Sequence, residues 1–214
     1  MRYSIPLFLI ALSFSCKGHE PASSAAPSQP AAGASAPTTA TTSSQLPVTS
    51  TESAVAPEVN PVGDIPDSQA FVVYDSKAGG YSLDVPEGWA RSESGANVTF
   101  IGKLDGVGVT VTPTASAPTA ATARDHEARD IQQRGRAVRI SEVKDVKLPS
   151  GPAVLIKFGS NSDPNAVTGK QLRQENETYL YFKNGREAAL TLWAPEGADN
   201  VDQWQRMSRS FRWK

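Results

Sequence analysis

Cysteine and histidine are nearly absent from this sequence. Its 214 residues include one cysteine, Cys16, and two histidines, His19 and His126. A single cysteine excludes an intramolecular disulfide, so disulfides cannot hold the fold together. Zinc sites need several cysteine and histidine ligands at short spacings, but the one cysteine lies at the N-terminus and His126 has no other histidine or cysteine near it in the sequence. Structural zinc sites of that kind are therefore excluded as well.

A long apolar run is also missing at the N-terminus. Residues 5–12 (IPLFLIAL) are apolar, but a membrane-spanning helix needs about 20 such residues. The run follows the basic start Met1-Arg2 and precedes the small residues Ser13 and Ser15. This order is typical of a secretory signal peptide, which we predict over residues 1–15.

The cysteine directly after this segment resembles the lipobox of bacterial lipoproteins, in which the thiol is lipidated and becomes the mature N-terminus. The resemblance implies a lipid anchor at Cys16 and an extracytoplasmic protein facing the periplasm or the cell surface. Lys17 replaces the aspartate that retains some lipoproteins at inner membranes, which favours the outer membrane. Ser13 stands where the lipobox usually has an aliphatic residue, so ordinary secretion is the alternative.

Residues 16–69 contain few large apolar side chains and are rich in alanine, serine, threonine and proline. Such a segment has little to bury, and chain entropy favours disorder. We therefore predict a flexible, lipid-anchored linker that makes few contacts with the domain that follows.

Residues 70–214 have the length of one domain. They carry 19 basic and 17 acidic side chains, a balance that argues against nucleic acid as a partner. Alternating or continuous apolar runs at 81–85, 107–111 and 153–158 predict strands, and Asn184-Gly185 predicts a tight hairpin. Helices are predicted over 120–134 and from Asp199 or Asn200 onward. The inner stripe of the second is expected at Val201, Trp204 and Met207 or Ser208.

This order of elements resembles the PsbP-like fold, named for an extrinsic subunit of photosystem II and found also in a Ran-binding import factor and in bacterial lipoproteins. The resemblance rests on YSLDVPEGW at 81–89, on Trp193-Ala194-Pro195 and on the terminal helix ending in Ser210-Phe211-Arg212. It implies an α+β fold, an antiparallel sheet flanked by helices (an α/β/α sandwich). Proteins of this fold share no catalytic centre, so the resemblance implies no catalytic residues.

Two motifs offer chemistry. His126, beside Asp125 and Glu127, could centre a hydrolase if a serine from elsewhere in the fold came near it. Residues 160–170 place Asn161, Asp163 and Asn165 at alternate positions, as the first half of a calcium loop does, but Ala166 replaces the expected glycine. The sequence favours the simpler interpretations, an exposed helical histidine and an ordinary long turn between two strands.

Two surfaces are candidates for partner binding. Strand alternation along the hairpin places Tyr179, Tyr181 and Trp193 on one face, which is either core or an aromatic platform. Arg206, Arg209 and Arg212 form a basic ridge near a helix C-terminus, where cations are favoured in any case.

The sequence as a whole predicts a protein without enzymatic activity, metal or cofactor. We expect a membrane-anchored module that binds an envelope protein or a cell-wall component.

Overall fold

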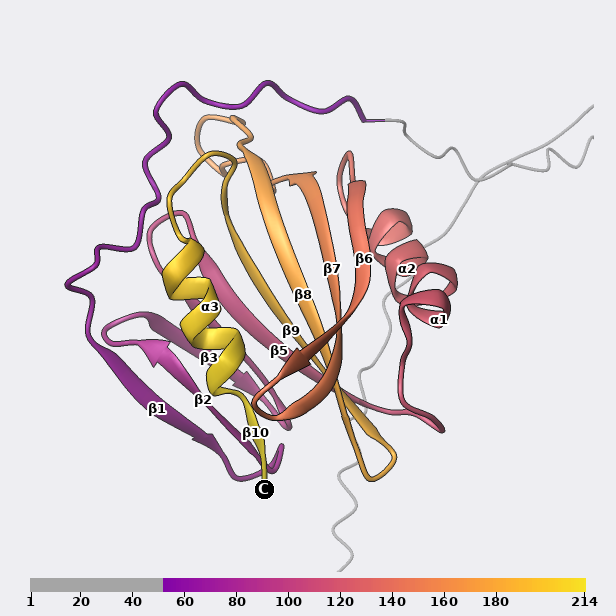
Figure 1. Cartoon of the computed structure of the whole chain (residues 1–214). Helices are drawn as coiled ribbons and strands as arrows, with labels where there is room; N and C mark the ends of the chain where they lie inside the picture. Colours follow the sequence, from indigo (N-terminus) through magenta and orange to yellow (C-terminus); the bar gives the residue numbers. More distant parts are fainter. Residues whose placement is uncertain (1–51) are drawn as a thin grey trace, which may run out of the picture. The chain divides into compact units, whose positions relative to one another are not determined.

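The computed structural model describes residues 52–214, which form two antiparallel sheets and three helices (Figure 1). The three-stranded sheet has the order β1-β2-β10, and the seven-stranded sheet has the order β3-β4-β5-β9-β8-β7-β6. The elements are β1 (Phe71–Ser76), β2 (Tyr81–Pro86), β3 (Ala90–Ser94), β4 (Asn97–Ile101), β5 (Gly106–Pro113), α1 (Ala120–Asp125), α2 (Glu127–Arg134), β6 (Arg139–Leu148), β7 (Gly151–Asn161), β8 (Arg173–Lys183), β9 (Arg186–Pro195), α3 (Val201–Ser210) and β10 (Arg212–Trp213).

The predicted α+β class is confirmed. Helices cover both faces of the large sheet: α3 lies on one face, together with the small sheet, and α1 and α2 lie on the other (Figure 1). None of the helices among residues 52–214 combines the length and apolarity needed to cross a membrane.

The alternation of side chains along β7 explains these layers. Ala153 and Leu155 pack into the core beneath α3, whereas Val154 and Ile156 pack beneath α1 and α2. A strand that is apolar on both faces can be buried on both, as the continuous run at 153–158 predicted.

The helix predicted over 120–134 is interrupted at His126. Its φ of −115° and ψ of −81° lie outside the helical region, so α1 ends and α2 begins there. Thr119 and Thr122 form a capping box at the start of α1.

The last helix begins where the sequence predicted, after Asn200, and buries Trp204, Met207 and Ser208. Val201 was expected on this buried stripe but is 73% exposed. The reason is that Asn200 takes the inward position and accepts a hydrogen bond from the Ile65 N–H (2.6 Å).

Part of the predicted linker packs on the domain, which corrects the boundary at residue 70. Ile65 is only 3% exposed, and the Glu52 carboxylate accepts a hydrogen bond from Asn161 Nδ2 (2.8 Å). Residues 52–69 run along the ends of the strands of the large sheet (Figure 1). One buried isoleucine and several polar contacts anchor a segment whose composition alone suggested none. Residues 1–51, which include the predicted signal peptide and Cys16, lie outside the described residues.

Candidate functional site

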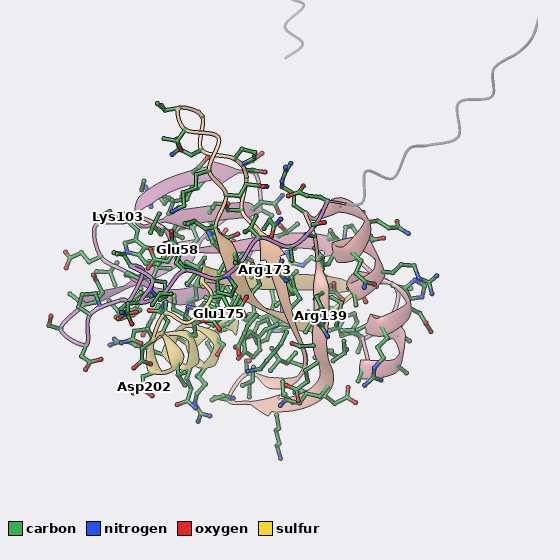
Figure 2. The ribbon with its side chains drawn as sticks, turned by 90° about the horizontal axis from the view of Figure 1, so that it is seen from above. Glu58, Lys103, Arg139, Arg173, Glu175 and Asp202 are labelled. Carbon is green, nitrogen blue, oxygen red and sulfur yellow. The ribbon has the colours of Figure 1, made fainter. Side chains whose placement is uncertain are left out.

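A groove lies between α3 and the part of the large sheet that α3 leaves uncovered. We call it the front groove. It consists of two adjoining pockets of about 290 and 280 Å³, which share Lys157, Glu175, Glu177 and Trp204. Figure 2 shows Arg173 and Glu175 between α3, which carries Asp202, and Arg139. The remaining walls are formed by Arg139, Ser141, Phe158, Gly159, Arg173, Asn176 and Glu196 in the first pocket and by Tyr179, Ala198, Asn200, Val201 and Gln205 in the second.

Strand register brings these side chains together. In β8, Glu175 pairs with Gly159 of β7, and Glu177 pairs with Lys157. Gly159 pairs in turn with Arg139 of β6. Residues that pair directly across an antiparallel sheet point to the same face, so all of these side chains face α3.

Arg173 lies on the floor of the groove and is only 7% exposed. Its Nη1 donates hydrogen bonds to the carbonyl of Ala137 (2.9 Å) and to Asn161 Oδ1 (3.2 Å), and its Nε lies 3.4 Å from Glu196 Oε2. A Cβ atom at Gly159 would lie 2.4 Å from Nη2, so the guanidinium occupies the space that this glycine leaves open. Within residues 52–214, Nη2 has no hydrogen-bond acceptor.

Two carboxylates of the groove are already paired: Glu196 with Arg173, as described above, and Glu177 with Lys157 and Tyr179. Lys157 Nζ lies 2.5 Å from Glu177 Oε1, and the Tyr179 hydroxyl donates to Glu177 Oε2 (2.6 Å). Burial, followed by the charge of Glu196, raises the pKa of Glu175 above its usual value. Burial penalises the ionised form, so Glu175 stays protonated to a higher pH than an exposed glutamate does.

Trp204 forms the wall between the two pockets. The residue is 7% exposed, and its Nε1–H is buried without a hydrogen-bond partner among the described residues. Leaving a buried donor unpaired costs about 1–3 kcal/mol. The Nε1 atom itself has no accessible surface, so a molecule in the groove would contact other atoms of the indole ring. What makes the groove a candidate binding site is the Arg173 Nη2 donor on its floor, which has no acceptor within residues 52–214.

The predicted aromatic face does not exist as one surface. Tyr179 pairs with Leu190, and Tyr181 pairs with Ala188, so both tyrosines face α3. Trp193 pairs with Asn176 and therefore lies on the opposite face of the sheet. The expectation assigned the facing partners one residue out of register, and such a slip exchanges the two faces. Tyr181 is core, and its hydroxyl donates to the carbonyl of Ser208 (2.7 Å).

The structure brings the three arginines of the predicted basic ridge together, because Arg206, Arg209 and Arg212 line one open hollow at α3 and β10. Two of these arginines also make contacts within the folded domain. Arg206 Nε lies 3.3 Å from Asp84 Oδ2, and Arg212 Nη1 donates to the carbonyls of Arg209 and Phe211. A partner for this ridge stays a prediction.

The hydrolase and calcium alternatives gain no support from the geometry. His126 is exposed between α1 and α2, and its ring makes no hydrogen bond within residues 52–214. Asn161 Oδ1 accepts from Val55 N (3.1 Å) as well as from Arg173, and Asn165 Oδ1 accepts from two backbone N–H groups of its own turn. In the described part of the chain, no group of three or more histidine, cysteine, aspartate or glutamate side chains is placed to bind a metal ion.

No local sequence motif indicates the front groove, because Arg173, Gly159 and Trp204 lie in three separate segments. Comparison with known proteins does not identify a ligand either. No protein-family model and no curated protein sequence matches the chain.

Solved structures show what fold the chain shares. The solution structure of cyanobacterial PsbP (CyanoP) from Synechocystis sp. PCC 6803 is similar to it, with a TM-score of 0.50 and 16% identity over 72% of this chain and 99% of that one. The Saccharomyces cerevisiae Ran-binding protein Mog1p aligns with a TM-score of 0.47 and 11% identity, over 68% of this chain and 96% of that one. The similarity to CyanoP supports a PsbP-like domain and concerns the fold alone.

Proposed function

We propose that this protein is a non-catalytic binding module that a lipid on Cys16 holds at a bacterial membrane, with the front groove as its binding site. One observation carries the proposal: Arg173, which is 7% exposed, lines the groove with its Nη2 lacking an acceptor within residues 52–214. A largely buried polar group in a native protein normally has partners for its donors, so a bound molecule is the natural source of the acceptor.

The surrounding side chains favour binding over catalysis. The charged groups of the groove are largely engaged in ion pairs, Lys157 with Glu177 and Arg173 with Glu196. Fixed pairs of this kind orient a ligand but leave no free nucleophile with an adjacent base, which acyl and phosphoryl transfer require.

The membrane part of the proposal rests on the sequence before the described domain. An export signal followed by a lipidated cysteine would place the domain outside the cytoplasm, with an envelope protein or a cell-wall component within reach. The outer membrane is the favoured site because Lys17, not aspartate, follows Cys16.

Site-specific photocrosslinking in cells that make the protein tests the groove. A photoreactive amino acid at Arg139, on the exposed rim, is expected to capture a partner, whereas the same amino acid at Arg129, exposed on α2 on the other side of the sheet, is not. The adduct at residue 139 should weaken when Arg173→Lys removes the guanidinium donors on the floor of the groove. Equal capture from both positions would contradict a binding site in the front groove.

Fractionation tests the anchor. Cys16→Ser is expected to move the protein from the membrane fraction to the soluble fraction without changing the thermal unfolding of the domain. A variant that stays with the membrane after a high-salt wash would show that lipidation is not what holds it.

A further inference from the structure

We infer that the front groove binds a carboxylate group of a peptide, with the guanidinium groups of Arg173 and Arg139 as its donors. The inference rests on the proposed function, because it names the chemistry of the molecule that the groove takes. Some polar atoms of the groove already have hydrogen-bond partners, and others have none; the second group indicates what a ligand must supply.

The free atoms are donors. Arg173 Nη2 makes none of the hydrogen bonds or ion pairs of that side chain within residues 52–214, and Arg173 lines the larger pocket. The Arg139 side chain, on the rim of the same pocket, makes no hydrogen bond or ion pair within that part of the chain. Both groups are permanent donors, since a guanidinium cannot accept.

The acceptors, by contrast, are mostly occupied. Glu177 is engaged by Lys157 and Tyr179, and Glu196 by Arg173. Glu175 is half-buried, and burial, followed by the charge of Glu196, raises its pKa, so the ionised form is disfavoured relative to an exposed glutamate. The groove therefore has a surplus of donors, which calls for a ligand rich in acceptor oxygens. Guanidinium groups bind carboxylates especially well, because the two planar groups match in geometry.

Charge and size favour a carboxylate over a doubly charged anion. The ion-paired carboxylates Glu177 and Glu196 lie in the same groove as the free donors, and like charges disfavour a dianion such as phosphate more than a monoanion. The first pocket, of about 290 Å³, is at the small end of ligand sites and suits one end of a chain more than a large molecule. The second pocket has Ala198, Val201 and the ring of Tyr179 among its walls, so it can take a neighbouring apolar side chain.

Gly159 holds the arrangement in place by having no side chain. Its hydrogen leaves room for Arg173 Nη2, and a methyl group there would lie 2.4 Å from that nitrogen. Gly159→Ala should therefore displace the guanidinium without touching the ligand pocket elsewhere. Gly108→Ala is a matched control, because Gly108 also lies in a strand of this sheet and a Cβ there would meet its nearest atoms at an ordinary 3.7 Å.

The test uses the full-length protein in detergent and three short peptides. One is acetyl-Ala-Val-Ala with a free C-terminal carboxylate, the second is the same peptide with a C-terminal amide, and the third is an amidated peptide with an internal aspartate. The readout is the ¹H–¹⁵N signal of the Trp204 indole, which Trp204→Phe assigns by removing it.

A carboxylate peptide is expected to shift this signal as it saturates the groove, and the uncharged amide is expected to bind at least about tenfold more weakly, which corresponds to about 1.4 kcal/mol. Binding of the first peptide identifies a C-terminal carboxylate as the natural ligand group, and binding of the third identifies an acidic side chain. Arg173→Lys and Gly159→Ala should weaken binding several-fold, and Gly108→Ala should not, with each variant measured at a temperature at which its thermal melt shows it folded.

Equal binding of the amide and the acid, or no shift of the Trp204 signal with either carboxylate peptide, would overturn the inference. Its failure can be told from failure of the proposed function. If residue 139 still captures a partner in cells while no carboxylate peptide binds, the groove is a binding site for other chemistry. If neither occurs, both proposals fail.

Discussion

Glu187 makes the stability of this protein depend on pH in a direction that can be measured. It lies in β9 on the face that α1 and α2 cover, two residues before Ala189 of the core on that side, and it is 7% exposed. Burial, followed by the nearby charge of Glu127, raises the pKa of Glu187 from 4.5 to about 7. Glu187→Gln keeps the shape of the side chain and removes its titration.

The sign follows from proton linkage. In the unfolded chain Glu187 loses its proton near pH 4.5, whereas in the folded chain it keeps the proton until about pH 7. Folding is therefore favoured by this group below pH 4.5, and the advantage is lost as the pH rises through about 7. Each pKa unit corresponds to about 1.4 kcal/mol, so the free energy of unfolding should fall by about 3 kcal/mol across this window.

Urea unfolding of wild type and Glu187→Gln near pH 4.5 and near pH 8 measures the effect. The difference in free energy of unfolding between the two proteins is expected to change by about 3 kcal/mol between these pH values, in favour of the glutamine variant at the higher pH. Glu87→Gln, at an exposed turn position, should show no such change. If wild type and Glu187→Gln keep a constant difference, Glu187 is not a buried, titrating carboxyl and the reasoning is wrong.

Other predictions concern stability. Trp204→Ala should lower the free energy of unfolding by about 3–5 kcal/mol in urea melts, whereas Arg209→Ala on the exposed side of α3 should change it by no more than about 0.5 kcal/mol. Tyr181→Phe removes the hydrogen bond to the Ser208 carbonyl and should cost about 1–3 kcal/mol, because the carbonyl stays buried. Deleting residues 52–65 removes a buried isoleucine and should lower the melting temperature; an unchanged melt would mean that these residues do not pack on the domain in solution.

Local patterns were sufficient for the elements that depend on local physics. Asn184 and Gly185 form the predicted two-residue turn, with φ values of 50° and 73°, a conformation that asparagine and glycine adopt most easily. The two-residue length of this turn also sets the register of the hairpin. Because Lys183 pairs with Arg186, Tyr179 must pair with Leu190, and the sequence alone could have separated the two tyrosines from Trp193. That error came from the counting of residues and not from missing information.

The linker boundary shows where composition fails. Residues 52–69 look like the rest of the polar linker, yet Ile65 is buried and Glu52 is bound by Asn161. Whether one apolar residue in a polar segment is buried depends on whether the folded domain offers it a site. The neighbours along the chain carry no information about that site.

The sequence by itself determined the fold class, the positions of most strands, the start of the last helix and the core residues on alternating strands, because these follow from the spacing of apolar residues along one segment. Only the tertiary structure decided where the front groove lies. Arg173, Gly159 and Trp204 come from three elements, and their proximity depends on strand register and on how far α3 extends over the sheet. The local sequence determines to which face of a strand a side chain points. Whether another element covers that face depends on packing between segments that are distant in the sequence.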